Sequence, residues 1–136
     1  MPCRVPLTDL LEATRKKQGV GLLGDLPPMQ EARRPGNRDF VRGDRSGPSC
    51  TPRLTRRAGE AWRRLGFTGA RNLPYAGGYI TRHYGRPTSN MHALQIEMRR
   101  GLYMDESTRT PHSGFTALSN ALTILVERVL AHFPPA

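Results

Sequence analysis

Met91-His-Ala-Leu-Gln-Ile-Glu-Met-Arg99 is the strongest strand signal in this sequence of 136 residues. Its apolar side chains alternate or run together, a pattern typical of a largely buried strand. Shorter apolar runs at Val20–Leu23 and Phe67–Arg71 indicate two more strands. With about three strands in all, the expected sheet is small.

Three amphipathic segments surround these strands and predict helices at Leu7–Lys17, Thr51–Leu65 and Phe115–Phe133. The middle helix has the clearest start, because Thr is a favourable N-cap and Pro52 suits the first helical position. Long stretches without periodicity, Leu26–Thr51 and Asn72–Pro87, are expected to be loops. The resulting order, α-β-loop-α-β-loop-β-α, predicts an α/β sheet with helices on its faces.

The length suits one domain, but the predicted core is thin for an independent α/β domain. We therefore expect residues 1–136 to be a single partial domain. The sequence contains neither a run of about 18 apolar residues nor an apolar signal region, which argues against a membrane span and secretion. Its two cysteines include no CxxC pair, so a reduced, cytoplasmic setting is expected.

The formal net charge of +10 comes mostly from arginine, with 19 Arg against two Lys. Of these arginines, 11 lie between Glu31 and Arg71, together with four acidic residues. Two interpretations are open. A GC-rich genome favours arginine codons, whereas a polyanion-binding surface would use the charge directly but normally employs lysine as well.

Glu97 is the first candidate for chemistry, because a carboxylate in a mostly apolar strand is costly unless it is paired or used. Burial there would raise its pKa, as suits a general base. The structural alternative is that Glu97 points outward or pairs with Arg99 or Arg100.

Other candidate residues give weaker signals. His83 and His92 have no partner at metal-ligand spacing, so no metal site is predicted from them. Gly77-Gly78 predicts a tight turn, which would either let the backbone approach a ligand or be a plain turn, the commoner case. The tripeptide Arg42-Gly43-Asp44 is interpreted as a chance match to an adhesion motif, and Cys50 has no neighbouring base to make it a nucleophile.

Three ordered motifs nevertheless resemble one family. They are Asn72-Leu-Pro-Tyr-Ala-Gly-Gly-Tyr-Ile-Thr-Arg-His-Tyr-Gly-Arg-Pro87, His92-Ala-Leu-Gln-Ile-Glu-Met-Arg-Arg-Gly-Leu-Tyr-Met-Asp-Glu106 and Asp39-Phe-Val-Arg-Gly-Asp-Arg-Ser-Gly-Pro-Ser-Cys50. Together they are similar to the C-terminal half of N-formylglutamate amidohydrolases. The resemblance extends over Leu7–Phe133, and the family's N-terminal half has no counterpart in these residues.

This resemblance implies a partial zinc-carboxypeptidase-like (phosphorylase/hydrolase-like) fold, with a mixed sheet flanked by helices. It also implies hydrolysis of the formyl amide of N-formyl-L-glutamate to formate and glutamate in histidine degradation. Zinc is the cofactor expected for the family. By position, Glu97 resembles the family's catalytic carboxylate and Arg100 an arginine suited to a substrate carboxylate. Asn72, His83 and His92 match motif positions and are carried over as substrate-binding candidates.

Two departures from the family pattern bear on activity. Asp25 follows the first strand as in an Asp-x-His-Ser motif, but the His-Ser pair is missing between Leu26 and Pro27. Arg99 stands where the family usually has Asn. His112-Ser113-Gly114 imitates another family motif in the wrong order and is interpreted as coincidence. With these ligands missing, we predict no metal-binding residues and no activity from the chain alone.

Two alternatives remain open at this point. One is an arginine-rich nucleic-acid-binding module over Arg33–Arg71, although its sparse aromatic residues argue against recognition of single strands. The other is the C-terminal half of a split enzyme, completed by a separately encoded N-terminal half. If active, the chain would take a small N-formyl amino acid and would need no membrane partner.

Overall fold

The computed structural model describes residues 4–29, 38–72 and 75–131. Within them, five strands form one mixed sheet around β5 (Met91–Arg99). On one side of β5 lie two parallel strands, β1 (Gly21–Asp25) and β2 (Pro28–Met29). On the other side β3 (Phe40–Gly43) runs antiparallel, and β4 (Gly69–Arg71) pairs parallel to β3. The predicted α/β class and the central strand are therefore confirmed.

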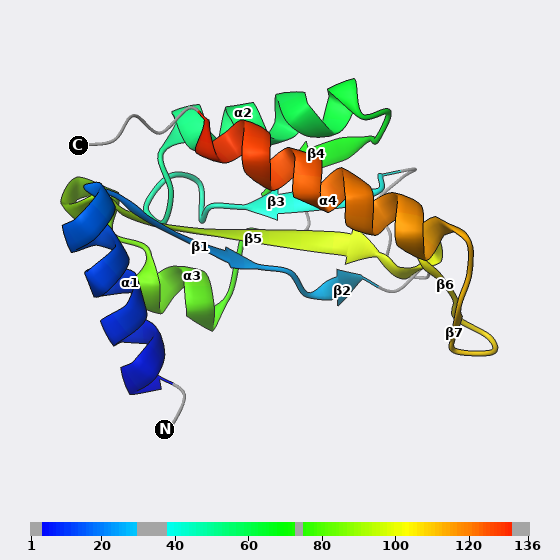
Figure 1. Ribbon diagram of the computed structural model, residues 1–136, viewed down its shortest axis with the longest axis horizontal. Coiled ribbons are helices and arrows are strands. Elements are labelled where there is room, and N and C mark those ends of the chain that lie inside the picture. The colour runs from blue at the N-terminus through cyan, green and yellow to red at the C-terminus, as the bar shows by residue number, and fades with distance from the viewer. Residues whose placement is uncertain (1–3, 30–37, 73–74, 132–136) are drawn as a thin grey trace.

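Helices cover both faces of this sheet (Figure 1). One face carries α1 (Arg4–Gln18) and α3 (Tyr79–Tyr84), and the other carries α2 (Pro52–Arg64) and α4 (Gly114–Leu130). The remaining elements are two 3-10 turns, η2 (Pro87–Ser89) and η3 (Arg100–Leu102), and a short hairpin of β6 (Met104–Asp105) and β7 (Thr110–Pro111). None of the helices in the described ranges is long and apolar enough to span a membrane.

Side chains of β5 contribute to two separate cores, because successive residues of a strand point to opposite faces. Leu94, Ile96 and Met98 belong to the core under α2 and α4. Met91 and Ala93 belong to a smaller core under α1 and α3. A strand that is covered on both faces has a nearly continuous apolar sequence, and this is why β5 could be predicted so clearly.

The larger core is anchored by aromatic stacking between the sheet and α2. The ring of Phe40 lies 3.9 Å from that of Trp62, and Phe67 meets Phe40 edge-on at 5.2 Å. Thr51 and Pro52 begin α2 as predicted, although the Thr51 side chain makes no capping bond. Gly66 follows the helix with a positive φ of 89°, a conformation that glycine adopts without strain.

Both expected loops were predicted wrongly. Leu26–Thr51 contains β2 and β3, so the sheet has five strands instead of about three. Asn72–Pro87 contains the helix α3. The four residues of β3 include an arginine and a glycine, and pairing with β5 makes them a strand where their own pattern does not. Residues 30–37 of the first stretch and 132–133 of the last predicted helix lie outside the described residues.

Candidate active site

Glu97 lies half-buried on the face of β5 that is covered by α1 and α3. Its Oε1 accepts a hydrogen bond from Nε2 of Gln95 at 2.7 Å. Asp25, the last residue of β1, is the register partner of Gln95, so all three side chains share one face. The carboxyl ends of parallel strands are where α/β sheets commonly place ligands.

The electrostatics of this face favour a proton acceptor. Burial raises the pKa of Glu97, the charge of Asp25 raises it further, and the Gln95 hydrogen bond opposes both effects. Burial also raises the pKa of Asp25. Two neighbouring carboxyl groups with raised pKa values are the kind of arrangement that general acid-base catalysis uses.

The alternative partner for Glu97, an arginine of its own strand, is not found. Arg99 instead contacts Asp39, with Nη2 and Oδ1 separated by 3.1 Å. Arg100 lies in η3, and among the described residues its side chain has no hydrogen-bond or ion-pair partner. A guanidinium without an internal partner fits the predicted contact with a substrate carboxylate, which stays a prediction.

A glycine-containing segment lies against this face of the sheet. A Cβ on Gly43 would stand 2.7 Å from backbone atoms of Ala76 and Gly77, so the chain passes directly over β3 there. Gly77 has a φ of 123°, which disfavours other residues, and Gly78 lies beside the side chain of Gln95. The backbone at Gly77-Gly78 thus packs closely on the sheet, next to the Gln95–Glu97 pair, and its approach to a ligand stays a prediction.

Asn72 is held by Asp44, away from Glu97. Its Nδ2 donates to Asp44 Oδ1 at 2.7 Å, and its Oδ1 accepts from the Asp44 backbone N–H at 3.1 Å. The fully buried Asp44 also accepts hydrogen bonds from Thr55 Oγ1 and from Nε and Nη2 of Arg71. Sequence interpretation missed this centre, because it treated Arg42-Gly43-Asp44 as a chance tripeptide.

The four bonds decide the charge of Asp44. Burial alone would raise its pKa, but the hydrogen bonds from Arg71, Asn72 and Thr55 outweigh burial and lower the pKa. A substrate-binding role for Asn72 stays a prediction, and its observed contacts are structural.

The two histidines lie on opposite sides of the sheet, His92 on the α2 side and His83 on α3. His92 is 4% exposed, and its side chain lies on the α2 side of β5, where Nδ1 accepts a 3.4 Å hydrogen bond from the backbone N–H of Thr51. Burial lowers its pKa, which keeps the ring neutral at physiological pH. His83 lies on α3 and stacks on Tyr79 with ring centres 5.1 Å apart.

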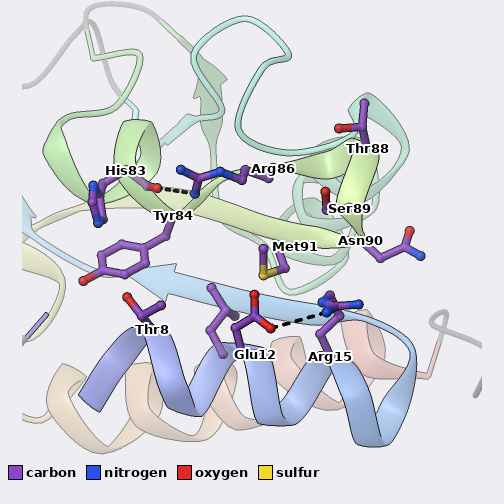
Figure 2. A pocket seen from close by; sticks show the side chains of 11 residues that line it. Thr8, Glu12, Arg15, His83, Tyr84, Arg86, Thr88, Ser89, Asn90 and Met91 are labelled. Atoms are coloured by element: carbon purple, nitrogen blue, oxygen red, sulfur yellow. Dashed lines mark hydrogen bonds and ion pairs between the residues drawn. The ribbon is translucent and has the colours of Figure 1, made fainter. Parts of the chain in front are cut away.

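His83 also lines a cavity of about 660 Å³ between α1, α3 and η2 (Figure 2). On the helix side, Glu12 and Arg15 form an ion pair at 3.3 Å. On the other side, Arg86 Nη1 donates to the His83 carbonyl at 2.6 Å. Met91 lines this cavity at the start of β5, roughly 20 Å along the strand from Glu97. The structure therefore places His92 on the opposite face of β5 from Glu97, whereas His83 lies on α3, on the same side of the sheet as Glu97.

The residues that the structure describes contain no group of three or more His, Cys, Asp or Glu side chains that could hold a metal ion. Asp25 and Glu97 are one pair of acids, short of the three protein ligands of a catalytic zinc site. Cys50 is buried, and burial raises the pKa of its thiol to about 12, so it is no ready nucleophile.

Comparisons with known proteins place this geometry in a family. The family model of N-formylglutamate amidohydrolase matches residues 3–104. The N-formylglutamate deformylase from Pseudomonas putida is 34% identical to this chain, in a match that covers 71% of the chain and 38% of the deformylase. The N-formylglutamate deformylase from Pseudomonas aeruginosa is 30% identical, in a match that covers 95% of the chain and 50% of the deformylase. The crystal structure of the N-formylglutamate amidohydrolase from Ralstonia eutropha JMP134 superposes with a TM-score of 0.87 at 35% identity, over 97% of this chain and 50% of that one. The chain spans at most about half the length of these relatives, and it belongs to the N-formylglutamate amidohydrolase family.

Proposed function

We propose that this chain carries the proton-accepting part of a site that hydrolyses the formyl amide of N-formyl-L-glutamate. The observation that supports the proposal is the half-buried Glu97, whose pKa is raised by burial and by Asp25 at the carboxyl end of β1. The names of the relatives supply the substrate, and the activity would place the chain in histidine degradation in the cytoplasm.

In this proposal Glu97 takes a proton from the attacking water, whose oxygen adds to the formyl carbon. The carbon–nitrogen bond then breaks, and the proton passes to the leaving amine, so that the products are formate and glutamate. Gln95 holds Glu97 Oε1 in place, and Asp25 keeps the carboxylate basic. Arg100 would pair with a substrate carboxylate, because a planar guanidinium suits bidentate binding.

Zinc is implied by the family resemblance, but the described residues do not fit it, because they offer no three-ligand group. We therefore route no step through a metal. We propose instead that the 136 residues by themselves do not turn over N-formylglutamate, and that the missing groups would come from residues outside these 136.

The test measures formate release from N-formyl-L-glutamate by the chain purified without a chelating tag, with and without added Zn²⁺. We expect no turnover and less than stoichiometric zinc. Stoichiometric zinc together with turnover would refute inactivity. In that event, Glu97→Gln must abolish the activity if Glu97 is the base.

The role of Glu97 is testable independently in the full-length deformylase from Pseudomonas aeruginosa. Changing the carboxylate that aligns with Glu97 to its amide should lower kcat by roughly 10²–10⁴-fold with little change in KM, the range expected for loss of a general base. An amide substitution at an exposed position of the helix aligned with α4 is the control. An unchanged kcat in the first variant would overturn the assignment.

A further inference from the structure

Four arginines surround a second cavity, of about 300 Å³, on the face of the sheet opposite Glu97. Arg42 and Arg71 are register partners on β3 and β4, while Arg56 and Arg63 lie on α2. Seven residues separate the two helical arginines, so they lie on the same side of α2, about two turns apart. The other lining residues are Pro52, Gly59 and Gly69.

Positive charge in this arginine cavity exceeds the negative charge that contacts it. Arg71 is paired with Asp44, with Nη2 and Oδ2 separated by 2.7 Å. In the part of the chain that the structure describes, the side chains of Arg56 and Arg63 make no hydrogen bond or ion pair, and both residues are exposed. Like charges gathered this closely repel one another unless an anion joins them.

Arg42 shows that the arginine cavity is built into the fold. Its Nη1 donates to the backbone carbonyl of Thr55 at 3.2 Å, whereas its Nε is buried without a partner. Burial lowers the pKa of Arg42 and the charges of Arg63 and Arg71 lower it further, while the charge of Asp44 only partly opposes them. A guanidinium in this setting is stabilised by a negatively charged ligand.

Gly59 makes room for that guanidinium. A Cβ at position 59 would overlap the head group of Arg42, although the position lies in the middle of α2. Glycine is less favourable than alanine inside a helix. The glycine at position 59 therefore destabilises α2, but it leaves the space that the Arg42 guanidinium occupies beside the cavity.

We propose that the arginine cavity binds a phosphate group carried by a small molecule. Guanidinium groups match the oxygen geometry of phosphate, and several converging on one cavity would share its charge. The site is independent of the proposed hydrolysis, because Arg42 is the register partner of Ile96, on the opposite face from Glu97. It would also account for part of the arginine concentration between Glu31 and Arg71.

The test titrates the chain with inorganic phosphate and pyrophosphate at constant ionic strength, using isothermal titration calorimetry. Arg56→Gln and Arg63→Gln should each weaken binding roughly tenfold, since each removes one charge-assisted contact. The matched control is Arg64→Gln, which removes the same charge from the same helix at a position that does not line the cavity. Its affinity should stay within about twofold of the parent, as expected for long-range screened charge.

Several outcomes overturn the proposal. One is a lack of saturable phosphate or pyrophosphate binding, and another is an equal loss in Arg64→Gln. The third outcome comes from a separate titration with a 20-base-pair DNA duplex as the probe. If the duplex binds with a steep salt dependence while pyrophosphate does not, the charge serves a nucleic-acid backbone and not a small phosphate. As a readout on the unaltered protein, pyrophosphate should shift the NMR signals of the Arg42 and Arg71 guanidinium groups.

Discussion

Gly59 and Arg42 are coupled at the level of single residues. Replacing an exposed helical glycine with alanine normally stabilises a protein by about 1 kcal/mol. Here we expect Gly59→Ala to lower the free energy of unfolding by about 1–3 kcal/mol, because the new methyl group would displace the Arg42 head group. In an Arg42→Ala background the same change should be neutral or stabilising. Urea unfolding of the four proteins measures the coupling, and stabilisation by Gly59→Ala alone would contradict it.

Asp44 makes the second residue-level prediction. Its pKa in the folded protein is lowered below the ordinary 3.8, so its stabilising contribution is complete above that value and is lost as the pH falls through the folded pKa. Asp44→Asn should therefore cost about 3 kcal/mol near neutral pH, as expected when a buried ion pair is broken. The cost should shrink in acid, well below pH 3.8.

Urea unfolding at a series of pH values checks this dependence. Asp9→Asn is the control, because Asp9 is exposed on α1, and it should change stability by less than about 0.5 kcal/mol. A cost for Asp44→Asn that stays constant down to strongly acidic pH would show that shape and not charge explains its contribution.

At the level of elements, the pairing of β1 with β5 determines the chemistry of Glu97. Asp25 reaches Glu97 only because β1 lies parallel to β5 with Asp25 opposite Gln95. Asp25→Asn removes a like charge and should lower the pKa of Glu97 towards its ordinary value of 4.5. Carbon-13 NMR of the side-chain carboxyl group measures this shift directly. Asp105→Asn, at the exposed end of β6, is the control. Equal shifts in both variants would refute a specific Asp25 effect.

The same pairing explains what the sequence could predict. β5 and α2 carry their own signals, since one is apolar throughout and the other has a clear start and an apolar face. β3 carries almost none, because its strand conformation depends on β5, about 50 residues further along the chain. For the site, an acid in an apolar strand indicated Glu97. The partnership with Asp25 could not be predicted, because it depends on register between two distant strands.

At the scale of the whole molecule, the sheet separates two groups of opposite charge. The acidic pair of Asp25 and Glu97 lies on the face of α1 and α3, and the arginine cavity lies under α2. The layer of apolar side chains on β5 between them prevents the acids from neutralising the arginines directly. The net charge of +10, which already counts both acids, is expected to act as repulsion within the folded chain.

Repulsion of this kind makes stability depend on salt. Because added ions screen exposed charges, raising NaCl from about 0.02 to about 0.3 M should increase the free energy of unfolding by roughly 1 kcal/mol. Chloride is chosen because it has no bidentate oxygens to engage guanidinium groups. A variant in which Arg53, Arg64 and Arg128 become Gln should gain less from salt, since all three are exposed and none lines the arginine cavity. Denaturation midpoints measured across the salt series test this increase in stability. A stability that falls as salt is added would mean that ion pairs outweigh charge repulsion.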